Sequence, residues 1–421
     1  MNRMPVPAAT TELLTNGQSN KWTVLGLLFF AAALNYGDRT AITTVFPLLQ
    51  RDLGMSNLAL GATGTAFLWS YAIASPLAGF LGDRMSRARL LTWSLGAWSL
   101  VMALTPLVTS TWQLIAMRVL LGVAEAGYIP AATALIADYH GPETRAKAIG
   151  IHIAGFSVGM VGGGWLSGFL GDHYGWRPAF VMLGVSGLVL TAVCAAWMRD
   201  AVTPDSRGSE SASFGSILGE LTRIPSFFLL TAELVLMSVT SWIFINWLPL
   251  YFKETFSLSL AMAGLYGTLW IQGGRVTGFL IGGTPSDRLA KRDPKYRILM
   301  MAACYLCAAP VLLVFAYEQR LAWIAAAIVI YSLLIAMGYV NAQPVLCEIL
   351  PDRVRSTAIG LMNMAACTSG GVGVIIAGAL KSDFGLARSF ASLSLIVGLV
   401  TVMLFVGYRT VIPRDLARPG R

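Results

Sequence analysis

Charged residues are scarce in this chain: only 12% of its 421 residues are Asp, Glu, Lys or Arg, against about 25% in a soluble domain. Most of the chain therefore cannot face water. Histidine and cysteine are also few, with three and five residues. Cys304 and Cys307 form a CxxC pair inside an apolar run without a second ligand pair, so we expect packing rather than a metal or redox site. No nucleophile–histidine arrangement or nucleotide-binding loop is evident, so we do not expect an enzyme.

What the chain has instead is long apolar runs, and 56% of its residues are hydrophobic. A helix needs about 20 apolar residues to cross a hydrocarbon core of roughly 30 Å, and unbroken runs of that length predict helices rather than barrel strands. Residues 1–20 lack the features of a signal peptide, so we expect the first span to be retained. The predicted spans are twelve: 22–49, 58–82, 89–109, 112–138, 147–171, 177–198, 225–252, 261–285, 297–317, 321–348, 356–380 and 388–409.

The net charge of +9 is distributed unevenly over the loops. If both termini lie in the cytoplasm, 21 Lys and Arg residues fall on the cytoplasmic side and six on the outer side. This is the positive-inside bias of membrane proteins, so the basic character reflects topology and we expect no nucleic-acid partner. The sequence predicts a multi-pass protein of the plasma membrane, in bacteria the inner membrane, with both termini cytoplasmic.

The chain repeats itself after about two hundred residues. The segment PLLQRD at 47–52 aligns with PLYFKE at 249–254, an offset of 202, and RAKAIG at 145–150 aligns with RSTAIG at 355–360, an offset of 210. Six spans per repeat is an even number, so both copies share one orientation. Such repeats are related by an axis along the membrane normal, and we expect the two lobes to face each other across a central cavity.

A polar stretch at 199–224 divides the spans six and six, and its composition suits a flexible connector with a surface helix near Phe214–Leu221. The predicted fold is an all-α membrane protein of twelve transmembrane helices in two pseudo-symmetric six-helix bundles. Its parts are a cytoplasmic tail at 1–21, a first bundle at 22–198, a linker at 199–224, a second bundle at 225–409 and a tail at 410–421.

Each half carries a basic loop after its second span. The first reads GFLGDRMSRAR at 79–89 and the second GTPSDRLAKR at 283–292. The first loop resembles the loop 2–3 signature of the major facilitator superfamily, with Ser86 where Gly is usual. The segment LIAMRVLLG at 114–122 resembles the span 4 signature of that superfamily, with Leu121 where a polar residue is common. The resemblance covers nearly the whole chain, and it implies the major facilitator fold and transport by alternating access.

Two subfamilies within the superfamily share further segments with the chain. NYGDR at 35–39 and GVAEA at 122–126 are similar to the organic anion:cation symporters, which carry sugar acids and related carboxylates. EAGY at 125–128, LIAD at 135–138 and GWR at 175–177 resemble the Spinster-like lipid transporters. Both substrate classes therefore stay open.

Four ionisable residues lie inside the first and fourth predicted spans: Asp38, Arg39, Arg118 and Glu125. An Asp, Lys or Arg at mid-span costs about 2.5–3.5 kcal/mol on insertion scales, so the four are expected to face a wet cavity or one another. Arg118 and Glu125 are two helical turns apart and share a face. Gly122 between them is expected to leave that face open.

The alternative is that these charges form two Arg–carboxylate pairs that only staple helices together. At the offsets of 202 and 210 the second half has uncharged residues instead, namely Thr240, Ser241, Ile328 and Ile335. A packing device would be expected in both halves, and buried ion pairs rarely improve stability. The asymmetry favours a functional role.

The chemistry of these side chains suggests which residue binds the substrate and which residues couple transport to a proton. Arg39 is the predicted substrate-binding residue because its planar fork suits a carboxylate, and Tyr36 shares its helix face. Asp38, Glu125 and Arg118 are the predicted proton-coupling residues. We expect Asp38 to pair with Arg39 in an empty cavity and to release it on protonation, while Arg118 pairs with Glu125. The family resemblance implies the same assignments.

The second half is expected to supply further substrate contacts. Arg275 corresponds to Tyr71, because each lies twelve residues before a loop aspartate, and both are substrate-binding candidates. The rival interpretations of Arg275 are pairing with Glu233 or extension towards the membrane surface. The amide candidates, half of which are expected only to join helices, are Asn246, Gln272, Asn341 and Asn363.

The paired loops are predicted to form a gate at the cytoplasmic face. Asp83 and Asp287 end helices where a carboxylate can engage a helix N-terminus and nearby arginines. The alternative is that the loop charges only orient the chain. The predicted gating residues are Gly79, Asp83, Arg84, Arg87, Arg145, Asp287, Arg288 and Arg355.

These patterns predict a secondary active transporter, a proton-coupled symporter of a small organic anion such as a sugar acid or another carboxylate. In this family, exchangers carry Gly-Pro in span 5, whereas here Gly159 precedes Met160, which favours symport.

The first alternative is a Spinster-like carrier of lysolipids or other amphiphiles, and a remote one is a membrane-embedded enzyme or sensor. No cofactor is expected beyond the coupling proton. The expected partners are the anion and the bilayer, and the protein is expected to be a monomer.

Overall fold

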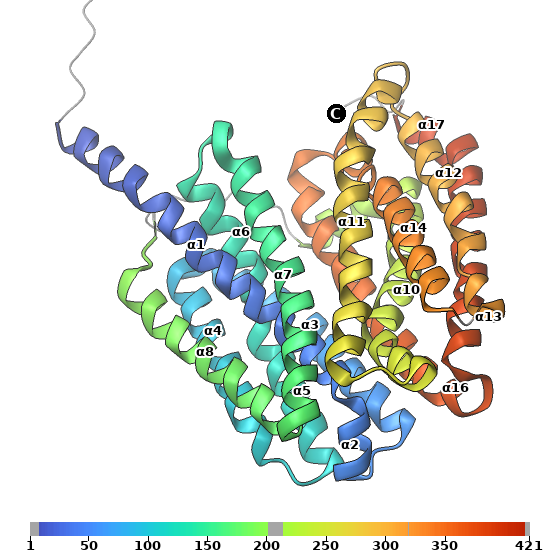
Figure 1. The fold of residues 1–421 in the computed structure, drawn as a ribbon. Coiled ribbons are helices and arrows are strands. Elements are labelled where there is room, and N and C mark those ends of the chain that lie inside the picture. The colour runs from blue at the N-terminus through green and yellow to red at the C-terminus, as the bar shows by residue number, and fades with distance from the viewer. Residues whose placement is uncertain (1–7, 201–213, 319, 417–421) are drawn as a thin grey trace, which may run out of the picture.

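The structure is a computed structural model that describes the backbone of residues 8–200, 214–318 and 320–416. Side chains are described for these residues apart from 8–20, 82–84, 142, 214, 352, 353 and 356. Every regular element within the described ranges is a helix. Figure 1 shows the helices as two bundles side by side, with α1 to α8 in one and α10 to α17 in the other.

The first bundle begins with a long helix and ends before the polar linker. Ser56, Ser86 and Ser110 cap helix N-termini in it, each accepting a hydrogen bond from the backbone N–H three residues further on. Its elements are α1 (Ala8–Thr44), α2 (Phe46–Leu53), α3 (Asn57–Arg84), α4 (Arg87–Leu104), the 3-10 turn η1 (Thr105–Leu107), α5 (Thr111–Glu125), α6 (Tyr128–Tyr139), α7 (Pro142–Tyr174) and α8 (Arg177–Trp197).

The second bundle repeats this order after a short connecting helix. Gly385, with φ 70° and ψ 161°, bends α16 between the predicted eleventh and twelfth spans, and a positive φ of this kind favours glycine. The elements are α9 (Phe214–Leu221), α10 (Pro225–Phe256), α11 (Leu260–Ala290), α12 (Tyr296–Val311), α13 (Val314–Tyr317), α14 (Leu321–Tyr339), α15 (Ala342–Ile349), α16 (Asp352–Arg409) and α17 (Val411–Leu416).

Each predicted span coincides with one helix or with two consecutive helices separated by a short break. Among the described residues, nine helical stretches are long and apolar enough to cross a membrane, and one of these, Thr357–Arg409, contains two predicted spans. The helices α1 and α11 are not among the nine, and they carry Asp38, Arg39 and Arg275 within the other two predicted spans. The fold is the predicted all-α membrane fold of two related bundles.

The described parts of the predicted linker and of the predicted C-terminal tail each contain a helix. The predicted surface helix in the linker is α9, and its Leu221 is buried. The residues predicted as a C-terminal tail include α17, whose Ile412 is buried. The Asp415 carboxylate there accepts a hydrogen bond of 2.8 Å from the backbone N–H of Ser226 at the start of α10. Helix α17 is therefore fastened to the second bundle.

The two bundles meet along two helix pairs, α7 with α11 and α3 with α16. Small residues allow the close approach: a Cβ at Gly164 of α7 would lie 2.8 Å from the carbonyl oxygen of Gly264 in α11. Between α3 and α16, the Thr65 hydroxyl donates a hydrogen bond of 2.7 Å to the carbonyl of Gly371. These crossings place the inner faces of the bundles opposite each other (Figure 1).

Candidate functional site

A buried ion pair joins the first and fourth predicted spans. The Arg39 guanidinium on α1 donates two hydrogen bonds to Oε2 of Glu125 on α5, 3.1 Å from Nε and 2.8 Å from Nη2. Nη2 also donates to Oδ1 of Asn35 at 3.1 Å, one helical turn earlier. Arg39 is 8% exposed and Glu125 is 0% exposed. Charge-assisted bonds of this length in a desolvated place are strong.

Three aromatic rings surround the same guanidinium. Its carbon lies 4.5 Å from the ring centre of Tyr36, 4.9 Å from that of Phe67 and 5.2 Å from that of Tyr71. All three distances are within the range of cation–π attraction. The predicted substrate-binding residues Arg39, Tyr36 and Tyr71 therefore lie together, although they come from α1 and α3.

Gly122 explains how α3 comes so close to this cluster. A Cβ at Gly122 would lie 2.5 Å from the carbonyl oxygen of Phe67 and 3.0 Å from the backbone nitrogen of Tyr71. Our expectation that Gly122 leaves its helix face open was wrong, because α3 fills the space. The absent side chain is what lets Phe67 and Tyr71 reach Arg39.

The pairing within the four charges also differs from the expected one. Glu125 pairs with Arg39 rather than with Arg118. Arg118 instead donates to the sulfur of Met102 at 3.6 Å and lies 5.7 Å from the ring centre of Phe180. Asp38, 2% exposed, interacts electrostatically with Glu125 and with both arginines, but no ion pair at contact distance joins it to Arg39 among the described residues. Spacing along single helices does not determine such contacts between helices.

Several polar atoms of this cluster have no hydrogen-bond partner among the described residues. These buried atoms are Asn35 Nδ2, Asp38 Oδ1, Arg118 Nε and Glu125 Oε1. Buried polar atoms are nearly always paired in folded proteins. The cluster is therefore more than an ion pair that joins two helices. Its remaining donors and acceptors can bind a proton, water or a polar ligand.

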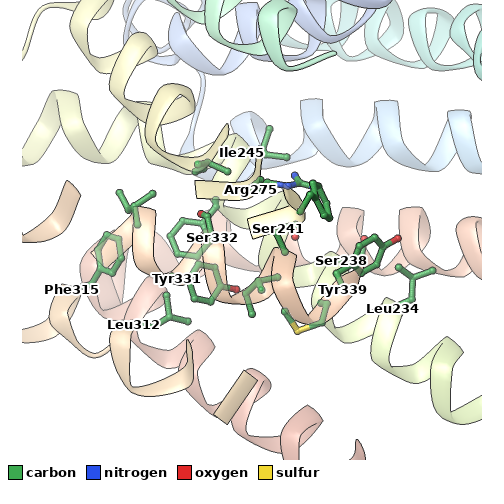
Figure 2. Close-up of a pocket in the computed structure, with 17 residues that line it drawn as sticks. Leu234, Ser238, Ser241, Ile245, Arg275, Leu312, Phe315, Tyr331, Ser332 and Tyr339 are labelled. Carbon is green, nitrogen blue, oxygen red and sulfur yellow. The ribbon is translucent and has the colours of Figure 1, made fainter. Parts of the chain in front are cut away.

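The second bundle contains a pocket of about 190 Å³ between α10, α11 and α14. Its wall is mostly apolar, and its polar residues are Ser238, Ser241, Ser332, Tyr331, Tyr339 and Arg275. Figure 2 shows the Arg275 side chain directed into the pocket beside Ser241 and Ile245. Among the described residues, none forms a hydrogen bond or an ion pair with Arg275. The rival pairing with Glu233 is absent, because Glu233 accepts a hydrogen bond from Tyr305 instead.

This pocket is the counterpart of the ionic cluster in the first bundle. At the repeat offsets, Arg39 corresponds to Ser241, Tyr71 to Arg275 and Glu125 to Ile335, and the second-bundle residues all line the pocket. The arginine has thus moved from the first helix of the repeat to the second, and its carboxylate partner has been replaced by isoleucine. An arginine without a counter-ion in an apolar wall is suited to binding an anion.

The four amide candidates lie in different places. Gln272 joins the bundles, since it accepts a hydrogen bond of 3.1 Å from the Ser157 hydroxyl of α7. The Asn246 amide donates to the carbonyl of Trp242 on its own helix. Asn341 contacts the Ser286 hydroxyl at the break between α14 and α15, and Asn363 is exposed. None of the four lines the pocket around Arg275.

The gating candidates make contacts inside each bundle. Arg87 pairs with Asp138 at 2.6 Å, and at the offset of 210 Arg297 pairs with Glu348 at 3.3 Å. Asp287 also pairs with Arg297, at 3.0 Å. The side chains of Asp83 and Arg84 lie outside the described residues, Arg288 is exposed, and a Cβ at Gly79 would meet nothing within 4 Å.

Arg145 and Arg355 have the same role in the two bundles. Arg145 donates to the carbonyls of Ala137 and His140, eight and five residues before it. Arg355 donates to the carbonyls of Cys347 and Leu350, again eight and five residues before it. Each arginine binds the C-terminal carbonyls of the preceding short helix, α6 or α15. In this conformation both join helices of one bundle.

The sequence patterns did not identify several residues that make contacts at or near these sites. They are Asn35 beside Arg39, the ion-paired Arg297 and Glu348, and Asp172 at the contact between the bundles. For Arg297 and Glu348 a signal exists, because they stand 210 residues after Arg87 and Asp138. No group of three or more potential metal ligands occurs in the part of the chain that the structure describes.

Known proteins resemble this chain over most of its length. It matches the family model described as Major Facilitator Superfamily at residues 28–374 and 268–421. It is 26% identical over 376 residues to an MFS-type efflux pump of Mycolicibacterium smegmatis, covering 87% of this chain and 86% of that protein. It is 23% identical over 380 residues to the hexuronate transporter of Bacillus subtilis, covering 87% and 89%.

Among solved structures, a bacterial homologue of the human lysosomal transporter Spinster, in an inward-facing and unoccupied conformation, matches with a TM-score of 0.83. The identity is 22%, and the match covers 95% of this chain and 99% of that chain. The fold is therefore shared, and the family model spans nearly all of the two bundles. This chain belongs to the Major Facilitator Superfamily, whose members are membrane transporters and not enzymes.

Proposed function

We propose that this protein is a symporter that carries a small organic anion together with a proton by alternating access. The observation that supports the proposal most is the relation between the two sites. The first bundle holds Arg39 with an internal counter-ion, Glu125. The second holds Arg275, at the place that corresponds to Tyr71, with no counter-ion among the described residues. A substrate anion can be bound by Arg275 directly and by Arg39 once Glu125 is neutralised.

Glu125 is the centre of the proposed coupling. When it takes up a proton it loses its charge, and Arg39 loses its counter-ion. A substrate carboxylate can then occupy the guanidinium fork. When the proton leaves, Glu125 pairs with Arg39 again and displaces the anion. Linkage requires the converse as well, so that a bound anion favours the protonated state of Glu125.

In this scheme protonation of Glu125, and not of Asp38 as expected from the sequence, releases Arg39, because Glu125 is the residue in contact with Arg39. Asp38 and Arg118 keep a supporting role, since both interact electrostatically with the pair. The substrate class proposed is a sugar acid or another carboxylate, in line with the hexuronate transporter to which the chain is similar.

A second candidate is the transport of an anionic amphiphile such as a lysolipid. The pocket beside Arg275 favours it, because most of its lining is apolar: Phe244, Ile245, Ile271, Phe315, Ile328 and Ile335 are examples. Apolar surface of this kind gains free energy by covering a hydrocarbon group. A thermal-shift screen of hexuronates, simple carboxylates and lysolipids on the purified protein separates the two candidates.

We also propose the topology and the gate that the sequence suggested. The lobes at 22–198 and 225–409 would move as units, with both termini in the cytoplasm of a bacterial cell and the protein acting as a monomer. The loops that contain Asp83 and Asp287 would exchange their partners between the inward-open and outward-open states.

The proposal is tested by uptake into proteoliposomes, with D-galacturonate as the first labelled probe and the ligands of the screen after it. An inward pH gradient should drive accumulation in the wild type. Glu125→Gln should keep counterflow exchange but lose gradient-driven accumulation, because Gln accepts no proton. Arg39→Ala should lose both, because the anion has lost its contact in the first bundle.

Two results would contradict this scheme. Uptake that is indifferent to the pH gradient would rule out proton coupling. Equal loss of exchange and accumulation in Glu125→Gln would assign Glu125 a structural role. Glu143→Gln, an exposed carboxyl in the first turn of α7, is the matched control and should behave as the wild type.

A further inference from the structure

The second bundle contains a buried carboxyl that the scheme above does not use. Glu233 on α10 is 1% exposed, and its Oε1 accepts a hydrogen bond of 2.7 Å from the Tyr305 hydroxyl of α12. No Lys or Arg among the described residues forms an ion pair with it. An ionised carboxylate buried without a cation is costly, so the neutral acid is the stable form in this conformation.

Glu233 is specific to the second bundle. At the offset of 202 it corresponds to Ala31, a buried alanine on α1. A carboxyl needed only for the packing of this fold would have no reason to be absent from the equivalent place in the first bundle. A methyl group suffices there, so packing does not account for Glu233.

The carboxyl lies at the edge of the Arg275 pocket. Leu234 follows Glu233 in the chain and Met237 is one helical turn further on the same face, and both line the pocket. Tyr305 packs on Gly338, where a Cβ would lie 2.5 Å from a ring carbon. The next residue, Tyr339, lines the pocket and is labelled in Figure 2 near Ser238 and Leu234.

Tyr339 also connects the carboxyl to the unpaired cation, because it interacts electrostatically with both Glu233 and Arg275. The titratable groups that interact with Glu233 are Tyr305 from α12 and Tyr339 from α14. Arg275 from α11 interacts in turn with Tyr339 and with Tyr331 of α14. The helices α1, α15, α16 and α17 bring no charged group that interacts with Glu233 among the described residues. Arg275 is the cation that lines the pocket next to Glu233.

We propose that Glu233 is a second proton-binding site whose ionised form is stabilised by Arg275. Release of the proton breaks the O–H bond of the neutral acid and passes the proton to water in the pocket. The resulting carboxylate then attracts the Arg275 guanidinium. A substrate anion and the Glu233 carboxylate compete for this one cation, so an anion on Arg275 keeps Glu233 protonated. This inference deepens the proposed function, since it adds a coupling site in the second bundle.

The test needs no substrate. Infrared difference spectra of the reconstituted protein, recorded from acidic to alkaline pH, report the C=O stretch of a neutral carboxyl. Subtraction of Glu233→Gln assigns the band of Glu233. We expect this band in the wild type at neutral pH and its loss at alkaline pH. In Arg275→Gln the ratio of ionised to neutral Glu233 at a given pH should fall about tenfold or more, because an opposite charge has been removed.

Two further variants allow the inference to be tested even if Arg275→Gln is poorly folded. Arg275→Lys keeps the charge and should restore most of the ionised fraction. Tyr305→Phe should shift the frequency of the band, because a hydrogen bond is lost, while the band still disappears at alkaline pH. A band that is missing at every pH, or an ionised fraction that Arg275→Gln and Arg275→Lys leave equal, would overturn the inference.

Failure here can be told apart from failure of the proposed function. If the Glu233 band titrates as described while uptake of every probe is indifferent to pH, the second proton site stands and the symport scheme fails. If uptake depends on pH through Glu125 while Glu233 never changes protonation, the reverse holds.

Discussion

Single residues account for the chemistry at the centre of the first bundle. Arg39 meets Glu125, Asn35 and three aromatic rings because α1, α3 and α5 come together at one level. The sequence located the four intramembrane charges, since each is costly in lipid and stands out against apolar neighbours. It did not determine which carboxylate pairs with which arginine, because that depends on how the helices are rotated against each other.

Gly122 gives a prediction at this scale. Gly122→Ala should lower the free energy of unfolding by about 1–3 kcal/mol, because the added Cβ meets the backbone of Phe67 and Tyr71 and forces α3 away. The same shift should weaken anion binding, since Tyr71 moves off Arg39. The melting temperature in detergent and a binding titration measure the two effects.

The control for this prediction is Gly26→Ala on α1, where a Cβ would meet nothing within 4 Å. Alanine in a helix interior is favoured over glycine by roughly 0.5–1 kcal/mol, so this variant should be neutral or slightly more stable. Equal melting temperatures for Gly122→Ala and Gly26→Ala would contradict the packing argument.

Helix ends decide how the elements are joined. Serines cap α3, α4, α5 and α11, and short polar sequence signals of this kind are readable in advance. One cap is different because it comes from the other bundle. The Asp172 carboxylate at the end of α7 accepts hydrogen bonds of 2.9 Å from the backbone N–H groups of Leu260 and Ala261 at the start of α11.

Asp172 should therefore hold the two bundles together at this end. Asp172→Ala removes two hydrogen bonds, each contributing about 0.5–1.5 kcal/mol, and a favourable charge at a helix N-terminus. We expect this end to open more often. A single cysteine at Thr44, which is buried and lies against Gly264, should react faster with a membrane-impermeant thiol reagent in a background without the native cysteines.

Asp383→Asn provides the matched control for Asp172→Ala. Asp383 is an exposed carboxyl near the bend of α16 and has no hydrogen bond or ion pair among the described residues. Its variant should leave the labelling rate of the cysteine at Thr44 unchanged. Unchanged labelling in Asp172→Ala as well would show that the cap does not hold the bundles closed.

At the scale of the whole molecule, the repeat relates positions that differ in chemistry. The offset of 210 carries the Arg87–Asp138 pair onto Arg297–Glu348 and reproduces the carbonyl contacts of Arg145 at Arg355. These ion pairs and carbonyl contacts are thus alike in both bundles, whereas the residues at the centre of each bundle differ. A common scaffold with unlike centres fits a carrier in which each bundle binds a different part of the cargo.

The proposed alternating access makes a prediction at this scale too. A Cβ at Gly171 would lie 3.2 Å from Leu260 Cδ1 across the contact between α7 and α11, so cysteines at both positions should come within reach of a disulfide. Oxidation of Gly171→Cys with Leu260→Cys should lock this end and stop uptake, and a reductant should restore it. The single variants should be insensitive to oxidant, and undiminished uptake by the oxidised double variant would argue against movement at this contact.

The sequence alone determined the spans, the two related halves and the four charged residues of the first bundle, together with the membership suggested by the loop motifs. These follow from the length of apolar runs and from the cost of charge in lipid, which are properties of the chain read in one dimension. The tertiary structure decided that Glu125 rather than Asp38 holds Arg39 and that α3 fills the space at Gly122. It also decided that Arg275 has no counter-ion among the described residues, while Glu233 lies beside its pocket. These contacts join helices far apart in the sequence, and small side chains at their crossings set how closely and in what rotation the helices meet.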